Sequence, residues 1–267
     1  MDEPRGRVLI IAGSDSGGGA GIQADIKTVT ALGGYAATAV TAVTVQNTLG
    51  VQAVHAVPAA LVEAQARAVL DDIGADAIKT GMLGDEDVVA AVARILDSAA
   101  LAPAVVDPVM VAKGGASLLS RGAAEAVKRL LVPRAALLTP NAHEAEALTG
   151  LVVTTTDGLR RAGEALLKLG AAAVLMKGGH VPGPTVTDLL ITPQGETSFE
   201  GERLDTPHTH GTGCTLASAS AVGLAQGLRL QDAVARAWAY TAEAIRRAPG
   251  FGAGHGPLDH AWPLRGD

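Results

Sequence analysis

The chain has few aromatic residues and a single cysteine. Aromatic side chains make up 2% of its 267 residues, which nearly excludes stacking platforms for single-stranded nucleic acid. The core must therefore be filled largely by Ala, Val and Leu. One cysteine, Cys214, can form neither an internal disulfide nor a cysteine-rich zinc site. A net charge of -6 also argues against a nucleic-acid-binding surface. We therefore expect no nucleic-acid partner.

Neither a signal peptide nor a membrane-spanning segment is predicted. The N-terminus is polar, and the apolar run Val8–Ala12 is too short for a secretory core. Residues 28–62 contain no Asp, Glu, Lys or Arg, but glycines, amides and a proline interrupt this stretch. Within it, the alternation over Thr38–Val45 predicts a buried β-strand. We expect a soluble, cytoplasmic protein with no membrane partner.

Alternation of strands and helices dominates the predicted organisation. A hydrophobic content of 48% and 33 glycines suit one large α/β domain or two small ones. The alternation favours a mostly parallel sheet covered by helices. Because no linker or repeat interrupts it, we predict a single domain over residues 1–267. Strands are expected at 7–12, 37–46, 51–57, 75–80, 104–107, 135–139, 172–177, 186–192 and 196–204, and helices at 20–32, 58–71, 85–98, 121–131, 142–149, 157–169, 212–226 and 230–247.

Polar residues and glycines gather where the predicted strands end. In mostly parallel sheets, ligands bind beyond the carboxyl ends of the strands. We therefore expect one binding site there, built from Gly13–Asp15, Gln46–Asn47, Gly81–Met82, Asp107, Asn141 and Lys177–Gly179.

A glycine-rich loop before the helix predicted at 212–226 is the most informative motif. It reads His208-Thr209-His210-Gly211-Thr212-Gly213-Cys214-Thr215. A helix start presents unpaired N–H groups and a partial positive charge, which favour an anion. In the first turn, the pKa of the Cys214 thiol is expected to be lowered. The motif predicts an anion hole with a reactive side chain, and the alternative is a glycine-rich loop with a buried cysteine.

A second glycine-rich loop, Gly13–Gly21, joins the first strand to the first helix. It fits a dinucleotide-binding fingerprint poorly, because no acidic residue follows about 20 positions on, and it lacks the lysine of a P-loop. The loop is better suited to bringing the backbone close to a small ligand. Asp25, inside the following helix, either faces that ligand or is a solvent-facing carboxylate.

Four further polar residues are candidates for binding phosphate or metal. Lys177 ends an apolar strand and either meets phosphate oxygens or points into water. Asn141 and Glu144, three residues apart at a helix start, either orient water around Mg²⁺ or form a capping box. Asp107 ends a strand and is suited to organising metal or phosphate. The loop after it carries Lys113, which is either a lid residue or a charged loop tip.

Taken together, these residues resemble the ribokinase-like superfamily, specifically the hydroxymethylpyrimidine/phosphomethylpyrimidine kinases of thiamine biosynthesis. The ordered set is far more specific than any one segment. The resemblance implies an α/β three-layer sandwich with a mostly parallel central sheet flanked by helices. Its matching segments are Ala12–Asp15, Gly18–Asp25, Thr41–Thr48, Lys79–Leu83, Asp107–Met110, Leu138–Glu144, Met176–His180, Thr209–Thr215 and Gly254–Pro257.

The resemblance also implies an activity and roles for single residues. ATP would phosphorylate 4-amino-5-hydroxymethyl-2-methylpyrimidine to its monophosphate and then to the diphosphate. The substrate would meet Gln46, which hydrogen-bonds the aminopyrimidine edge, and a pocket lined by Gly13, Ala20, Asp25, Met82 and Val109. The catalytic residues would be Lys177, which approaches the ATP phosphates, and Gly211, Thr212, Gly213 and Cys214, which form the anion hole. Mg²⁺ would be held through water by Asn141, Glu144 and Asp107.

Two departures from the family leave questions open. The first loop reads Asp15-Ser16-Gly17-Gly18-Gly19 where the family often has Asp-Pro-Ser-Gly-Gly, so we expect more flexibility there. Cys214 stands where the wider superfamily commonly has an aspartate that acts as the general base. A thiol can replace this aspartate as a base only if the pKa of the thiol is lowered. The alternative functions are a pyridoxal kinase of the same branch and a non-catalytic pyrimidine- or nucleotide-binding regulator. The oligomeric state stays open, with a homodimer among the states considered.

Overall fold

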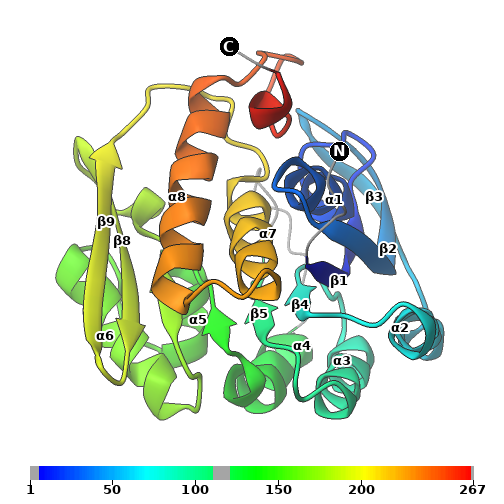
Figure 1. The fold of residues 1–267 in the computed structure, drawn as a ribbon. Coiled ribbons are helices and arrows are strands. Elements are labelled where there is room, and N and C mark those ends of the chain that lie inside the picture. The colour runs from blue at the N-terminus through cyan, green and yellow to red at the C-terminus, as the bar shows by residue number, and fades with distance from the viewer. Residues whose placement is uncertain (1–5, 111–120, 266–267) are drawn as a thin grey trace.

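A nine-stranded sheet runs through the part of the chain that the computed structural model describes, residues 6–110 and 121–265 (Figure 1). Lys113 lies outside these residues. The strand order is β3-β2-β1-β4-β5-β6-β7-β8-β9. In this order, each neighbouring pair within β2-β1-β4-β5-β6-β7 is parallel. The outer strands differ, because β3 pairs antiparallel with β2, β8 with β7, and β9 with β8. The strands are β1 (Arg7–Ser14), β2 (Tyr35–Asn47), β3 (Gly50–Ala56), β4 (Ala77–Thr80), β5 (Ala104–Val106), β6 (Leu137–Leu138), β7 (Val174–Met176), β8 (Thr185–Thr192) and β9 (Gly195–Glu202).

Helices cover both faces of the sheet, which confirms the predicted three-layer α/β sandwich (Figure 1). Alternate side chains of a strand point to opposite faces. Leu9 and Ile11 accordingly join one hydrophobic core, and Val8 and Ile10 join the other. The first core packs against α2 (Ala59–Asp72), α3 (Glu86–Ser98), α4 (Arg121–Ala126), α5 (Ala142–Thr149) and α6 (Thr156–Lys168). The second packs against α1 (Gly21–Ala31), α7 (Thr212–Ala225) and α8 (Leu230–Arg246).

The second half of β2 differs from the buried strand that its sequence pattern predicts. The exposed fractions of Val43 and Val45 are 52% and 54%. The parallel pairing of β1 with β2 ends at Ser14 and Val43, and β2 continues beside β3 alone. Past that point β1 no longer supports the strand, so one row of its side chains stays uncovered.

The helix expected at 121–131 also has a different form. α4 ends at Ala126, and Val127–Leu131 follows as a π-helical turn. Val127 and Leu131 are both buried in the same core as α2 and α3. The sequence therefore predicted a helix over this range, but not the wider helical turn in its second half.

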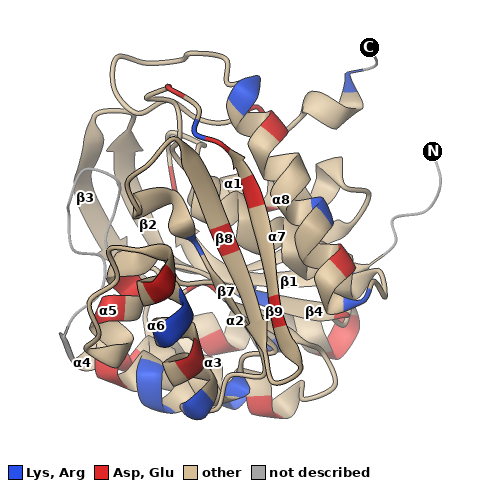
Figure 2. Cartoon of the chain, turned by 90° about the vertical axis from the view of Figure 1, so that its left-hand side faces the viewer, with Lys and Arg blue, Asp and Glu red and all other residues tan. Residues whose placement is uncertain are grey.

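In the view of Figure 2, α6 carries charged side chains of both signs, whereas those of α5 and of the β8–β9 hairpin are acidic. One connection between these elements is Arg160 of α6, which bonds Glu196 at the start of β9 with Nε–Oε2 at 2.7 Å. In residues 6–110 and 121–265, no helix combines the length and apolar character needed to cross a bilayer. The single-domain boundary at 1–267 stays a prediction.

Candidate active site

The carboxyl ends of the parallel strands border a cavity of about 1180 Å³. Most of the strand-end residues expected to share a site line it, among them Ser14, Asp107, Asn141 and Lys177, whereas Asn47, Gly81 and Gly178 do not. Sites for single small molecules measure roughly 300–1,000 Å³. A cavity of this size therefore has room for two ligands side by side.

One end of the cavity is small and largely apolar. Gly13, Ala20, Met82 and Val109 line it together with Gln46, as the family resemblance implied. Gln46 stands near the end of β2, where the pairing with β3 shifts register. Such bulges commonly re-aim a side chain next to a binding site.

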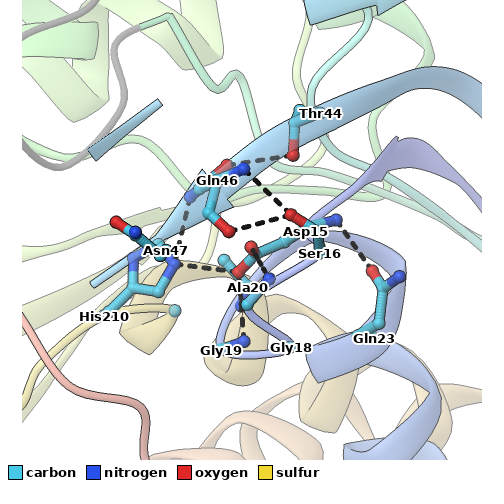
Figure 3. Close-up of polar contacts among 12 residues, drawn as sticks. Asp15, Ser16, Gly18, Gly19, Ala20, Gln23, Thr44, Gln46, Asn47 and His210 are labelled. Carbon is cyan, nitrogen blue, oxygen red and sulfur yellow. Dashed lines mark hydrogen bonds and ion pairs between the residues drawn. The ribbon is translucent and has the colours of Figure 1, made fainter. Parts of the chain in front are cut away.

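The backbone of Gln46 is fixed to the first glycine-rich loop (Figure 3). Its N–H donates to Ser16 Oγ at 2.9 Å, and the Ser16 hydroxyl donates to the Gln46 carbonyl at 2.8 Å. Asp15 further orders this loop, because its carboxylate accepts hydrogen bonds from the N–H groups of Gly17, Gly19 and Ala20 at 2.8, 3.0 and 2.8 Å. Side-chain bonds thus restrain a loop that lacks the family's proline.

Asp25 lies behind the cavity wall, in contrast to the lining position that the resemblance implied. Its side chain is fully buried, with both oxygens accepting from Lys79 Nζ at 2.9 and 2.8 Å. Ser218 of α7 donates to the same carboxylate at 2.7 Å. Burial acts to lower the pKa of Lys79, but Asp25, together with Cys214 and Asp107, outweighs it and raises that pKa to about 12. Asp25 is therefore the partner of a buried cation, neither facing solvent nor lining the cavity.

The segment predicted to form an anion hole lies at the N-terminus of α7. The helix begins at Thr212, and Gly211 before it has a left-handed backbone with φ +87°. A Cβ at Gly211 would lie 1.8 Å from the carbonyl oxygen of Gly19, so only glycine fits there. The first N–H groups of a helix have no partner within it. Those of Gly213 and Cys214 are placed in this first turn, and both residues line the cavity.

Cys214 stands beside the anion hole, but its pKa is not lowered. Burial raises the pKa of the thiol to about 11, and the nearby cation of Lys79 only partly opposes that change. The expectation of a lowered pKa is therefore wrong. The helix terminus acts on a partly buried side chain, and for this thiol the loss of solvation is the larger effect.

Lys177 lies in the middle of the cavity with its ammonium beside the anion hole. Its Nζ is 2.8 Å from Asp107 Oδ1 and 3.7 Å from Glu144 Oε2. Only 13% of its side chain is exposed, so it does not point into water. A Cβ at Gly213 would lie 3.1 Å from this Nζ. An anion bound at the start of α7 would therefore meet the cation as well.

Asn141 and Glu144 form the capping box that was one of their two predicted roles. Asn141 Oδ1 accepts from the Glu144 N–H at 3.0 Å, and Glu144 Oε2 accepts from the Asn141 N–H at 2.7 Å. Burial raises the pKa of Glu144 to about 7, against the effect of Lys177. Within the described ranges, no group of three or more His, Cys, Asp or Glu residues is arranged to hold a metal ion directly.

Three residues have structural roles in the site that the sequence did not predict for them. Asp15 and His210, 195 positions apart, meet with Oδ2 and Nε2 at 2.9 Å (Figure 3). Asp188 of β8 accepts from the Gly178 N–H at 2.7 Å and so fixes the backbone that follows Lys177. Burial raises the pKa of Asp188 to about 6. The signal for Asp188 was a lone carboxylate in an otherwise uncharged strand, whereas nothing local pairs Asp15 with His210.

The far end of the cavity lies between α8 and the chain that follows β9. Trp238 and Ile245 of α8 line it, opposite Leu204 and Thr206. Arg203 ties the neighbouring loop by donating to the carbonyls of Gly179, Val181 and Gly183 at 2.8, 2.6 and 2.7 Å. This part of the lining is partly apolar, and it belongs to the same cavity as Lys177.

Comparison with known proteins agrees with this geometry. The profile of the phosphomethylpyrimidine kinase family matches residues 15–259. The hydroxymethylpyrimidine/phosphomethylpyrimidine kinase of Streptomyces coelicolor is 50% identical over 257 residues, covering 96% of this chain and 95% of that protein. The thiamine biosynthesis bifunctional protein ThiED of Geobacter sulfurreducens is 51% identical over 257 residues; these cover 96% of this chain and 52% of that longer protein. A crystal structure of Bacillus subtilis pyridoxal kinase with ADP has a TM-score of 0.91 at 36% identity, covering 98% of this chain and 100% of that one. The chain therefore belongs to the phosphomethylpyrimidine kinase family.

Proposed function

We propose that this chain is a kinase that transfers the terminal phosphoryl group of ATP to 4-amino-5-hydroxymethyl-2-methylpyrimidine and then to the resulting monophosphate. Membership of the family and the names of its relatives support a phosphotransferase of thiamine biosynthesis. The observation that carries the proposal is a single cavity that joins the ring-sized end at Gln46 to Lys177 and the start of α7.

At the ring-sized end, Gln46 supplies the only side-chain amide near the small and apolar wall formed by Gly13, Ala20, Met82 and Val109, within the described lining. A primary amide presents one donor and one acceptor side by side. An aminopyrimidine edge presents the complementary pair, an amino group beside a ring nitrogen. The apolar wall then contacts the faces of the ring. Small-molecule sites commonly combine such an apolar lining with a few polar groups that fix the orientation of the ligand.

Between the two ends of the cavity, the start of α7 and Lys177 would stabilise the negative charge of the transferring phosphoryl group. Phosphoryl transfer depends mainly on alignment and on neutralising the charge of the moving group. The N–H groups of Gly213 and Cys214 and the dipole of α7 meet that charge from one side. The Lys177 ammonium meets it from the other, and Asp107 holds this ammonium in place with a 2.8 Å bond. The part of the cavity near Trp238 would bind the rest of ATP, in line with the ADP bound by the Bacillus subtilis pyridoxal kinase.

Mg²⁺ suits the oxygen donors around Lys177. Asp107, Asn141 and Glu144 offer two carboxylates and an amide, which match a hard cation held through water. When bound, the ion would supply positive charge to the phosphate oxygens. Glu144 Oε2 already accepts a hydrogen bond from the N-cap residue of α5. These side chains would therefore hold the ion through the waters around it and not by direct coordination.

Cys214 is proposed to align the substrate hydroxyl. With a pKa of about 11, the side chain is a thiol at neutral pH. Forming the thiolate at pH 7 would cost about 5 kcal/mol. A thiol can still hold the hydroxyl by a weak hydrogen bond and by contact, and alignment alone is a large part of phosphoryl transfer.

A product assay tests the function against its alternatives. The enzyme is supplied with ATP and Mg²⁺ and either the aminopyrimidine or pyridoxal, and monophosphate is resolved from diphosphate by chromatography. We expect the aminopyrimidine to yield both products in sequence. Faster turnover of pyridoxal would instead support the related kinase activity, and tight ligand binding without ADP formation would support a regulator. A homodimer and a cytoplasmic location also stay predictions.

A further inference from the structure

The side-chain amide of Gln46 has two ends with opposite hydrogen-bonding chemistry. We infer that Asp15 and His210 set the direction of this amide, with its oxygen toward His210 and its nitrogen toward Thr44. Asp15 and His210 are therefore positioning residues for ring specificity. The inference rests on the proposed role of Gln46 as the ring contact. It follows from counting the donors and acceptors in the network of Figure 3.

Asp15 determines which atom of His210 carries a hydrogen. Its carboxylate already accepts three backbone N–H groups, and its Oδ2 lies 2.9 Å from His210 Nε2. Burial acts to raise the pKa of Asp15, but the bonds from His210 and the backbone outweigh it, and the pKa lies below its ordinary value. A carboxylate only accepts. His210 Nε2 must therefore be an N–H donor, both in the neutral ring and in the protonated one.

His210 is itself held in place from several sides. Its backbone N–H donates to the Gly256 carbonyl at 3.1 Å, in the tail segment of the chain. Its ring packs so closely on the first loop that a Cβ at Gly19 would lie 2.6 Å from the ring carbon Cδ2. The Nε2–H group is thus fixed in direction as well as in chemistry.

The contacts of Gln46 fit this donor in only one of the two amide orientations. As placed, Gln46 Nε2 lies 3.2 Å from His210 Nε2, which brings two donors together. At the other end, Gln46 Oε1 lies 3.4 Å from Thr44 Oγ1. The Thr44 hydroxyl gives its hydrogen to the Ser14 carbonyl at 2.8 Å, so two acceptors meet there. Amide oxygen and nitrogen have nearly the same shape, and their bonding partners decide between them.

A half-turn of the amide exchanges its two ends and removes both mismatches. The single hydrogen of His210 Nε2 is then shared between Asp15 Oδ2 and Gln46 Oε1 in a three-centre hydrogen bond, and Gln46 Nε2 donates to Thr44 Oγ1. The result is one continuous chain from the Asp15 carboxylate to the Ser14 carbonyl. Because buried or half-buried polar groups left unpaired are costly, this orientation is strongly favoured.

The orientation has a consequence for the substrate. On the cavity side, the amide now offers an acceptor near His210 and a donor near Thr44. A 4-aminopyrimidine pairs with it only when its amino group faces the His210 side and its ring nitrogen faces the Thr44 side. The hydroxymethyl group is on the carbon next to the one that bears the amino group, so it too is directed toward His210. Gly211 and the anion hole follow His210 directly in the chain.

A ring with the reversed pattern tests the inference. The 4-oxo analogue of the substrate carries a ring N–H beside a carbonyl, so it mismatches the fixed amide twice. In the parent enzyme, we expect kcat/KM for the 4-amino ring to exceed that for the 4-oxo ring by at least about 100-fold. His210→Phe removes the donor and frees the amide to turn. We expect that preference to shrink by about tenfold, roughly the effect of one mispaired bond.

Further variants separate positioning from general damage. Thr44→Val keeps the shape and removes the acceptor at the other end of the amide, and it is expected to shrink the preference in the same direction. His210→Gln retains an N–H donor and is expected to restore the parent's preference. His55→Phe, at an exposed site on β3, is the matched control and is expected to change nothing. An equal loss for both rings in His210→Phe and Thr44→Val, with the preference unchanged, would overturn the inference.

A second measurement does not depend on catalysis. Long-range ¹H–¹⁵N spectra of histidine-labelled protein show which ring nitrogen is protonated, and His210→Phe identifies the signal. We expect a proton on Nε2, and a ring protonated on Nδ1 alone would overturn the inference. If the parent enzyme fails to phosphorylate the aminopyrimidine while this spectrum shows Nε2–H, the proposed function fails and the positioning network stands.

Discussion

The buried ion pair between Lys79 and Asp25 is the contact whose disruption we expect to be most damaging. Both side chains are fully buried, and Lys79 Nζ bonds both carboxylate oxygens at 2.8 and 2.9 Å. The pair joins three elements that build the site, since Lys79 is on β4, Asp25 on α1 and its third partner, Ser218, on α7. Lys79→Met keeps most of the side-chain volume and removes the charge.

The magnitude follows from what the substitution leaves behind. Removing one partner of a buried pair typically costs about 3–5 kcal/mol, because the other charge stays buried without compensation. Proton uptake by Asp25 limits the loss, since neutralising an aspartate with an ordinary pKa costs about 4 kcal/mol at pH 7. For a chain of this size, each kcal/mol shifts Tm by roughly 2–4 °C. We therefore expect Tm to fall by about 6–20 °C.

The pH dependence has a definite sign. In Lys79→Met the folded-state pKa of Asp25 is raised above its unfolded value, so the folded form binds a proton more tightly. The destabilisation is then largest near neutral pH and shrinks as the pH falls toward 5, by up to about 1.4 kcal/mol per unit. Urea unfolding of the parent and the variant at pH 5, 6 and 7 measures this trend.

A double-mutant cycle supplies the decisive comparison. Lys79→Met combined with Asp25→Asn removes both charges and keeps a polar partner for Ser218, so most of the lost stability is expected to return. Arg7→Met, which breaks an exposed pair with Asp76, is the control and is expected to change Tm little. A double variant no more stable than Lys79→Met would refute the reasoning. A raised KM for the ring with unchanged stability would instead return Asp25 to the role of a substrate contact.

Four further substitutions test the site itself. Gln46→Ala is expected to raise KM for the pyrimidine at least about tenfold while KM for ATP is unchanged; equal effects on the two in steady-state kinetics would contradict the assigned contact. Gly213→Val places a side chain against Lys177 Nζ, 3.1 Å from the Cβ position, so KM for ATP should rise and kcat fall while circular dichroism stays unchanged. Cys214→Ala is expected to lower kcat by less than the roughly 10²–10⁴-fold of a lost general base. A kcat that rises tenfold per pH unit from 7 to 9 in the parent would instead show a thiolate base. For Glu144→Gln the sign follows from a folded-state pKa of about 7, above the ordinary value of 4.5: the carboxyl's contribution to stability is present at low pH and is lost as the pH rises through about 7. The variant can retain the capping box, so at pH 8 its free energy of unfolding in urea should exceed that of the parent by up to about 3 kcal/mol. Near pH 4.5 the two should differ little. A parent more stable than the variant at pH 8 would contradict this prediction.

Local signals in the sequence predicted the elements that local physics decides. α5 begins and ends where predicted, because Asn141 caps its start and Gly150, in a left-handed conformation, follows its end. The pairing of β8 with β9 across a tight turn was likewise visible as two strand segments joined by turn residues. The exposure of Val43 was not visible, because it depends on where the neighbouring strand β1 stops and not on β2 itself.

In the site, the residue types were predictable but their partners were not. Lys177, Asp107 and Glu144 gather as expected, since the ends of adjacent parallel strands must lie together. The pairing of Asp25 with Lys79 links residues 54 positions apart, and neither residue has a local feature that reveals it. The pKa of Cys214 was predicted in the wrong direction because a helix terminus can be recognised in sequence, whereas the extent of burial cannot.

The close contact of the two glycine-rich loops explains how the site can work without a strong base. A Cβ at Gly211 would lie 1.8 Å from the Gly19 carbonyl oxygen, and one at Gly19 would lie 2.6 Å from His210 Cδ2, so neither position has room for a side chain. Asp15 bonds His210 across the same junction. The loop that contacts Gln46 and the loop proposed to bind the transferring phosphoryl group are therefore held together as one unit. Fixing the hydroxyl relative to the anion hole in this way supplies alignment before the reaction begins, which is the largest requirement of phosphoryl transfer. A thiol that keeps its proton until late in the reaction is compatible with that requirement, whereas a displaced ring is not.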